Sequence, residues 1–194
     1  MTVLESGETY DTETFDGEVT GHGGAAAFLE CTFDGAEMSG LRLDRARFSH
    51  CTLHEVRATD LRLVDASLLD TGLDGCRFGA LDASGAELRR VRWTGGKVDY
   101  ANLRSANLRD VTFSGCEFGE LDLLGATVRM VRFLDCRIGR LDLTSATLTD
   151  VDLTGADLGG FDGVGGLAGA TISGEQLHRL APTFAAHLGV RIAQ

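Results

Sequence analysis

A five-residue pattern repeats without insertion from residue 26 to residue 160. In each unit the first and third residues are small or apolar, and the other three are mostly polar or glycine. The clearest example is 101–105, with the sequence ANLRS, which is followed by 106–110, with the sequence ANLRD. Such a repeat predicts an architecture in which each unit packs mainly on its neighbours.

A second period of 20 residues lies on top of the first. The first residue of every fourth unit forms an all-alanine column: Ala46, Ala66, Ala86, Ala106, Ala126 and Ala146. A neighbouring column reads Leu41, Leu61, Leu81, Ala101, Leu121, Leu141 and Phe161. Steps of 15 or 25 residues would mix these columns, so four units make one coil that stacks on the next in register.

Extended backbone explains the five-residue unit. Side chains alternate between the two sides of a strand, so the first and third residues point inward together. Three residues of strand followed by a two-residue corner give a four-sided coil, and glycines such as Gly75, Gly95 and Gly115 suit the corners. With coils spaced by roughly 4.8 Å, almost seven of them make a rod roughly 30 Å long. The sequence therefore predicts an all-β solenoid.

The pattern resembles the pentapeptide-repeat family, whose consensus is A(D/N)LxX. The resemblance covers residues 26–160 and implies a right-handed quadrilateral β-helix of about seven coils of 20 residues. Residues 1–25 do not follow the frame, and we expect an N-terminal cap segment there. Residues 161–194 also leave the frame, and we expect an irregular last coil, a C-terminal helix and a dimerisation tail.

The C-terminal helix has a start signal and an apolar face. Ser173 and Gln176 have the spacing of a capping box. Leu177, Leu180, Phe184 and Leu188 recur at helical spacing. Pro182 is expected to break the helix near Ala181, Gly189 is a candidate C-terminal cap, and residues 190–192 could form a short strand.

The tail from Leu167 to Ile192 resembles that of the MfpA/Qnr-type pentapeptide-repeat proteins. That resemblance implies a homodimer formed through the C-terminal ends. The expected interface residues are Leu177, Leu180, Phe184, Leu188, Val190 and Ile192. The alternative is that the apolar helix face only covers the last coil.

Other protein classes find little support in the sequence. There is no apolar run of 18 residues and no secretion signal, so we expect a cytoplasmic protein that does not bind a membrane. The five cysteines all occupy inward positions and are expected to be reduced packing thiols. No cofactor or metal site is indicated. The five histidines are scattered and no catalytic motif occurs in a suitable context, so neither an enzyme nor a small-molecule substrate is expected.

Charge is concentrated at the two ends of the chain. Residues 1–40 carry nine acids and no Lys or Arg, and residues 141–178 carry six acids and again no Lys or Arg. The segment between them carries fourteen acids and sixteen bases, and the net charge is −11. Such a protein is expected to repel nucleic acid.

One outward column is rich in carboxylates: Asp82, Asn102, Asp122, Asp142 and Asp162. The MfpA/Qnr-type resemblance implies a DNA mimic that binds DNA gyrase or topoisomerase IV and gives protection from quinolones or a gyrase-poisoning natural product. The residues expected to face the topoisomerase are Asp82, Asp122, Asp142, Asp150, Asp152, Asp157 and Asp162. The alternative is that aspartate is simply common at this position and keeps the surface soluble.

Two basic columns argue against a uniformly DNA-like surface. They are Arg89, Arg109 and Arg129 on one side, and Arg57, Arg77 and Lys97 on another. Like charges roughly 4.8 Å apart repel, so the columns need neighbouring acids or an anionic partner. The chain also lacks the loop insertions that interrupt the repeat in Qnr proteins. A non-enzymatic interaction scaffold with an unrelated protein partner therefore stands as the second functional hypothesis.

Overall fold

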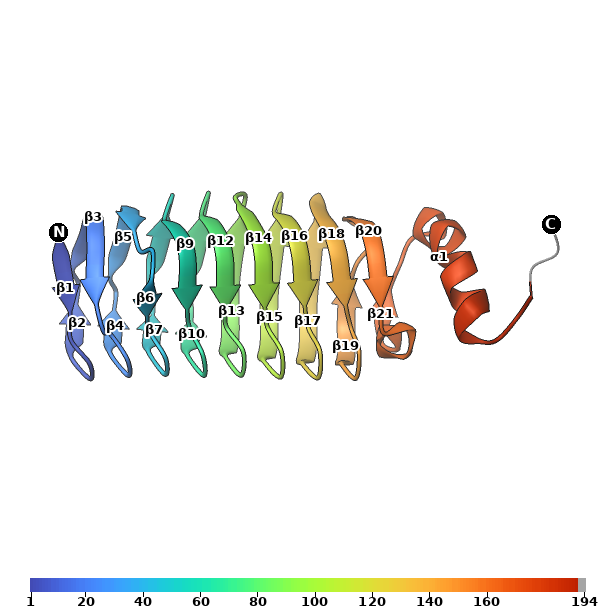
Figure 1. Cartoon of the computed structure of the whole chain (residues 1–194), viewed down its shortest axis with the longest axis horizontal. Coiled ribbons are helices and arrows are strands. Elements are labelled where there is room, and N and C mark those ends of the chain that lie inside the picture. Colours follow the sequence, from blue (N-terminus) through green and yellow to red (C-terminus); the bar gives the residue numbers. More distant parts are fainter. Residues whose placement is uncertain (192–194) are drawn as a thin grey trace.

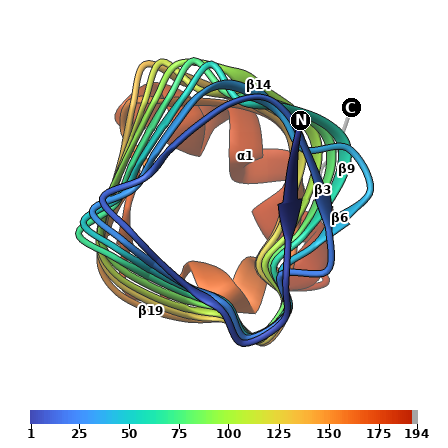
Figure 2. The same ribbon diagram turned by 90° about the vertical axis from the view of Figure 1, so that its left-hand side faces the viewer.

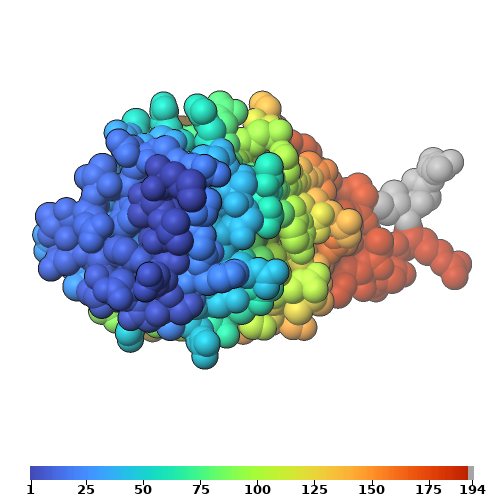
Figure 3. Space-filling model, turned by 60° about the vertical axis from the view of Figure 1, so that its left-hand side comes forward, coloured from blue at the N-terminus to red at the C-terminus, as the bar shows by residue number. Residues whose placement is uncertain are grey.

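Short parallel strands wind into a four-sided rod in the computed structural model, which describes residues 1–191 (Figure 1). Viewed along the rod, successive coils superimpose as a quadrilateral (Figure 2). In the space-filling view, the coils follow one another in sequence order, and α1 (Gly174–His187) extends beyond the last of them (Figure 3). The predicted all-β solenoid with a C-terminal helix is confirmed.

The strands are two to eight residues long and are separated by tight corners. Those of the first half are β1(Thr2–Leu4), β2(Thr9–Asp11), β3(Thr14–Gly21), β4(Ala27–Leu29), β5(Thr32–Glu37), β6(Leu41–Arg42), β7(Arg47–Ser49), β8(Thr52–His54), β9(Arg57–Arg62), β10(Ser67–Leu69), β11(Gly72–Asp74) and β12(Arg77–Asp82). Those of the second half are β13(Glu87–Thr94), β14(Lys97–Asn102), β15(Asn107–Ser114), β16(Glu117–Asp122), β17(Thr127–Leu134), β18(Cys136–Asp142), β19(Thr147–Asp152), β20(Ala156–Asp162) and β21(Ala170–Thr171).

Each strand of the repeat pairs with the strand one coil away, in parallel and in register. Leu88 of β13 lies opposite Leu108 of β15, which in turn lies opposite Val128 of β17. The partners are 20 residues apart, as the alanine column predicts. Residues that share a repeat position therefore form straight columns along the rod.

The inward positions build one continuous apolar core. Aromatic rings stack along it, with ring centroids 4.6 Å apart between Phe15 and Phe33 and 4.8 Å apart between Phe113 and Phe133. All five cysteines are buried and free. Burial raises the pKa of Cys51 and of Cys76 to about 11, so these thiols stay protonated at neutral pH.

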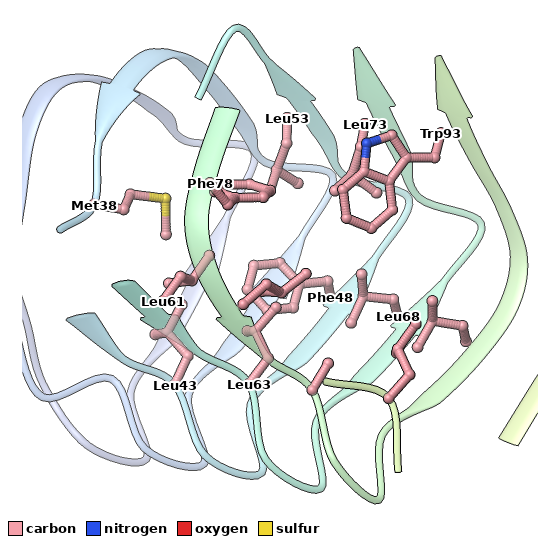
Figure 4. Close-up of a pocket in the computed structure, with 14 residues that line it drawn as sticks. Met38, Leu43, Phe48, Leu53, Leu61, Leu63, Leu68, Leu73, Phe78 and Trp93 are labelled. Atoms are coloured by element: carbon pink, nitrogen blue, oxygen red, sulfur yellow. The ribbon is translucent and has the colours of Figure 1, made fainter. Parts of the chain in front are cut away.

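The core is less tightly filled where leucines replace the stacked rings. Figure 4 shows an apolar void of about 20 Å³ in this part of the rod, and the side chains around it include Phe48, Leu63, Leu68 and Trp93. This is room for about one water molecule, but the lining offers almost nothing for a water to bond. The indole Nε1 of Trp93 is buried there without a hydrogen-bond partner.

Three of the four corners in each coil use a left-handed residue. Gly75, Gly95 and Gly115 have φ of 64°, 60° and 64°, and Asp70 and Asp110 adopt the same region with φ of 50° and 56°. At the fourth corner the chain continues as strand, as in β12 and β14. The fifth position of each unit therefore has two backbone roles.

Residues 1–25, expected as a cap, themselves form strands of the solenoid. Thr2 pairs with Val19 and Thr9 pairs with Ala27, so this first coil is three or two residues shorter than the others. A register shift near Gly17 absorbs part of the difference. Tyr10 and Phe15 point into the core as the apolar anchors of this coil.

The chain ends with η1(Val164–Leu167), β21 and α1. α1 starts with the predicted capping box, in which Ser173 Oγ accepts from the Gln176 amide at 3.1 Å and Gln176 Oε1 accepts from the Ser173 amide at 2.7 Å. At its other end Gly189 has φ of 70°, and the amides of Gly189 and Val190 donate to Ala186 and Ala185. This double hydrogen bond is a Schellman motif, which confirms Gly189 as the helix stop.

The expected break at Pro182 is wrong, because α1 runs through it. Proline removes one hydrogen bond, to the carbonyl of His178. Both residues are exposed, so water can bind the freed carbonyl. Val190 and Arg191 are not in a strand, and Ile192 lies outside the described residues. Within residues 1–191, no helix has both the length and the apolar character that crossing a bilayer requires.

Candidate interaction surfaces

The carboxylate-rich column predicted from the sequence is a straight line on one side of the rod. Asp82, Asn102, Asp122, Asp142 and Asp162 are successive register partners on β12, β14, β16, β18 and β20. We call this set the aspartate column. Its members are spaced by one coil, roughly 4.8 Å.

Most members of the aspartate column also hold the corner that follows them. One side-chain oxygen accepts from the backbone amide two residues later, at 3.0 Å from Asp122 to Leu124 and at 2.8 Å from Asp142 to Thr144. Asn102 makes the same bond, at 3.1 Å. Aspartate and asparagine form such turns readily, which explains locally why this position favours them.

Hydrogen bonds keep Asp142 charged. Partial burial raises the pKa of Asp142, but the Thr144 hydroxyl and amide more than offset this and hold the pKa below its usual value. The pKa of Asp152 is lowered mainly by its hydrogen bonds to Thr154. Both groups therefore carry a full negative charge at neutral pH.

Asp122 does not present its charge to solvent. Its side chain is 1% exposed, and its Oδ2 accepts from Arg104 Nε at 2.6 Å. The Tyr100 hydroxyl lies 3.4 Å from the same oxygen. The expectation that Asp122 forms part of an exposed acidic face is therefore wrong, because a neighbouring arginine covers and neutralises it.

Asp82 and Asp162 are partly exposed and have basic neighbours. Asp82 accepts from Asn102 Nδ2 at 2.9 Å and lies 3.6 Å from Arg62. Asp162 pairs with Arg140 at 2.7 Å. Among residues 1–191, Asp142 is the member of the column that is accessible and has no basic side chain within 4.0 Å.

The structure does not bring the remaining predicted aspartates onto the same side. Asp152 is the register partner of Arg132, and Asp157 is the register partner of Arg137, on two other sides of the rod. Asp157 pairs with Arg179 of α1 at 2.8 Å. Asp150 is exposed at a corner next to Asp152. The seven predicted residues therefore surround the C-terminal half of the rod and do not form a single face.

The apolar residues of the tail fall into two groups. Leu180 is 8% exposed and Phe184 is half-buried, so these residues turn toward the protein. Leu177, Leu188 and Val190 are 50%, 74% and 57% exposed. Ile192 lies outside the described residues.

The sequence profile of the pentapeptide repeat region matches residues 26–103 and 86–162. Together the two matches span well over half of the chain. The chain belongs to the pentapeptide-repeat family.

Solved structures with a similar chain trace include other repeat proteins. A trypsin-treated variant of QnrB1, a plasmid-mediated fluoroquinolone resistance protein, has 18% sequence identity over 100% of both chains, with a TM-score of 0.35. HetL, a pentapeptide repeat protein involved in heterocyst differentiation regulation from the cyanobacterium Nostoc sp. strain PCC 7120, has 20% identity. That match covers 84% of this chain and 86% of HetL, with a TM-score of 0.40. No curated protein sequence matches.

Sequence reasoning missed two residues that shape the surfaces of this pentapeptide-repeat protein. Arg104 neutralises Asp122, and the signal was an arginine 18 positions before an aspartate of the column. Gln176 does more than cap its helix, because its Nε2 donates to the carbonyls of Leu153 and Ala156 at 2.7 Å each. No periodic pattern signals the second role.

Proposed function

We propose that this protein binds a type II topoisomerase, DNA gyrase or topoisomerase IV, as a DNA mimic. In this role it protects the enzyme from quinolones or from a gyrase-poisoning natural product. The aspartate column on a straight rod is the observation that supports the proposal best. Its spacing of roughly 4.8 Å per coil is comparable to the roughly 3.4 Å axial spacing of phosphates along one DNA strand.

The proposed contact residues are the accessible acids near the C-terminal end. They comprise Asp82, Asp142 and Asp162 of the column, with Asp150, Asp152 and Asp157 on the adjoining sides. Asp122 is left out because it is buried. No Lys or Arg occurs between residues 141 and 178, so little positive charge opposes this end of the rod. A basic DNA-binding surface is the complementary partner.

We further propose a homodimer formed through the tails, in line with the tail's resemblance to MfpA/Qnr-type proteins. Leu177, Leu188 and Val190 are apolar and uncovered in the single chain, and a second copy would bury them. The dimer would place the acidic ends of both rods about its centre. Sedimentation equilibrium tests this, since Leu177→Glu with Leu188→Glu should convert a dimer into a 20.6 kDa monomer. A wild-type monomer would contradict it.

The topoisomerase proposal is tested by neutralising the accessible column. The variant Asp82→Asn/Asp142→Asn/Asp162→Asn removes three charges but keeps the oxygen that accepts the turn hydrogen bond. Asn102 already shows that asparagine fits this column. In a gyrase supercoiling assay, and in a cleavage assay with a quinolone, we expect the parent protein to act at micromolar concentration or below. The variant should need at least about tenfold more, which corresponds to about 1.4 kcal/mol.

A matched control removes three charges at the other end of the rod. Glu8, Asp11 and Glu13 are exposed in the first coil, and Glu8→Gln/Asp11→Asn/Glu13→Gln changes the net charge by the same amount. Its potency should stay within about twofold of the parent if the contact is local rather than a long-range charge effect. Equal potency of the column variant and the parent would show that this column is not the contact surface.

A further inference from the structure

A group of exposed arginines flanks one corner of the rod. Arg89, Arg109 and Arg129 are register partners on β13, β15 and β17. Just past the corner, Arg92 and Arg132 lie in one column on the two sides of Thr112. All five arginines are exposed. We call these five residues the arginine corner.

The arginine corner lacks the neutralising contacts found elsewhere on the rod. Arg62, Arg104 and Arg140 each lie within 3 Å of a carboxylate. Among residues 1–191, none of the five corner guanidinium groups has a carboxylate oxygen within 4.0 Å.

Two aspartates at the same corner offset only part of this charge. Asp70 is engaged by Arg90 at 2.6 Å, and Asp110 is exposed between the arginine columns. Guanidinium groups one coil apart, at roughly 4.8 Å between backbones, repel one another. An anionic partner would relieve this repulsion.

Apolar side chains lie beside the charges. Met130 and Leu134 are 38% and 40% exposed on β17, the strand that also carries Arg129 and Arg132. A polar hollow runs along the corner, with Gly72, Arg92, Thr112 and Arg132 among its lining residues. The surface therefore combines positive charge, an apolar edge and a depression.

These features fit a polypeptide better than a nucleic acid. No large aromatic side chain is exposed within residues 1–191, so the surface has no platform on which bases could stack. The net charge of −11 also repels a long polyanion, whereas a short acidic segment can stay within the corner.

We propose that the arginine corner binds an extended acidic polypeptide segment that also carries apolar side chains. In an extended segment, side chains on one face recur about every 6.8 Å, which lets carboxylates follow the arginine columns. Apolar side chains of the segment contact Met130 and Leu134. This surface is separate from the aspartate column, and the proposal does not depend on topoisomerase binding.

Fluorescence anisotropy with defined probes tests the proposal. The probe is a fluorescein-labelled 12-residue peptide with glutamate at every second position and leucine at two others. A labelled dT oligonucleotide of 12 nucleotides serves as the nucleic-acid arm. We expect the protein to bind the peptide more tightly than the oligonucleotide, and more weakly as salt rises. Arg109→Glu/Arg132→Glu should weaken peptide binding at least about tenfold.

Two further variants separate this surface from general charge effects. Arg57→Glu/Arg77→Glu changes the net charge equally on another side of the rod, where both arginines are exposed, and should change peptide binding by about twofold or less. Met130→Ser/Leu134→Ser should weaken binding of the leucine-containing peptide more than that of its all-serine analogue. Absence of peptide binding, an equal loss in the Arg57/Arg77 variant, or tighter binding of the oligonucleotide would overturn the proposal.

Discussion

Asp122 and Asp142 occupy the same repeat position on successive coils, yet their environments are opposite. Asp122 is buried beneath Arg104, whereas Asp142 has leucine, Leu124, at the equivalent preceding place. Because a carboxylate here lies next to the residue 18 positions earlier in the chain, that residue decides whether the charge is covered. A column of identical residues is therefore not a column of identical charges.

This difference predicts unequal costs for the same substitution. Asp122→Asn replaces a buried, charge-assisted contact to Arg104 with a neutral one and should destabilise the protein by about 1–2 kcal/mol. Asp142→Asn keeps its turn hydrogen bond and should change stability by about 0.5 kcal/mol or less. Urea unfolding followed by the buried Trp93 fluorescence measures both. Equal losses would show that Arg104 adds nothing to stability.

The repeat sequence predicts which residues point inward but not which charges remain free. Inward positions follow from backbone alternation alone, so residues such as Ala106 and Leu108 could be assigned with confidence in the core. The state of an outward carboxylate depends on which long side chain reaches it across coils. Asp157 and Arg179 show this well, since they meet only because α1 folds back over the last full coil.

At the scale of elements, α1 closes the C-terminal end of the solenoid. In the repeat, the carbonyl of Cys116 accepts from the amide of Arg137 in the next coil. Ala156 has the corresponding position in the last full coil, and its carbonyl accepts from Gln176 Nε2 instead. One side-chain amide thus replaces the backbone of a coil that does not exist.

We therefore expect Gln176→Ala to loosen α1 specifically. The substitution leaves the carbonyls of Leu153 and Ala156 without this donor, at a cost of about 1–3 kcal/mol. Hydrogen exchange of α1 amides should accelerate by about tenfold or more, while exchange in β13 and β15 stays unchanged. Glu175→Ala, at the exposed neighbouring position, is the control and should leave exchange nearly unaltered. Unchanged protection of α1 in Gln176→Ala would exclude this role.

Element boundaries were predictable where a local signal marks them. The capping box and Gly189 set the two ends of α1, and both involve hydrogen bonds within a few residues. The first coil had no such signal, because its spacing of 17 or 18 residues hides the five-residue frame. Pro182 was a misleading signal, since an exposed helix face tolerates the lost hydrogen bond.

At the scale of the whole molecule, the coil is the unit of stability, because each coil packs on its two neighbours. Removal of residues 87–106 deletes one full period, so Asp82 would stack directly on Asp122 and every column would stay aligned. We expect a folded rod that is shorter by roughly 4.8 Å. Removal of residues 87–96 deletes half a period and stacks unlike columns and unlike corners.

Thermal unfolding followed by circular dichroism distinguishes the two deletions. The 20-residue deletion should keep a cooperative transition near that of the parent, whereas the 10-residue deletion should unfold at a clearly lower temperature. Similar transitions for both would mean that the five-residue unit, rather than the coil, sets stability.

The two ends of the rod differ in what they allow a second copy to do. β1 pairs only with β3, and β2 only with β4, so the outer edge of the first coil carries open backbone groups. Glu5, Glu8, Asp11 and Glu13 surround that edge, and two such ends repel each other. The tail, in contrast, offers an apolar surface that satisfies itself when two copies meet. Association is thereby directed toward closed pairs and away from open-ended fibres.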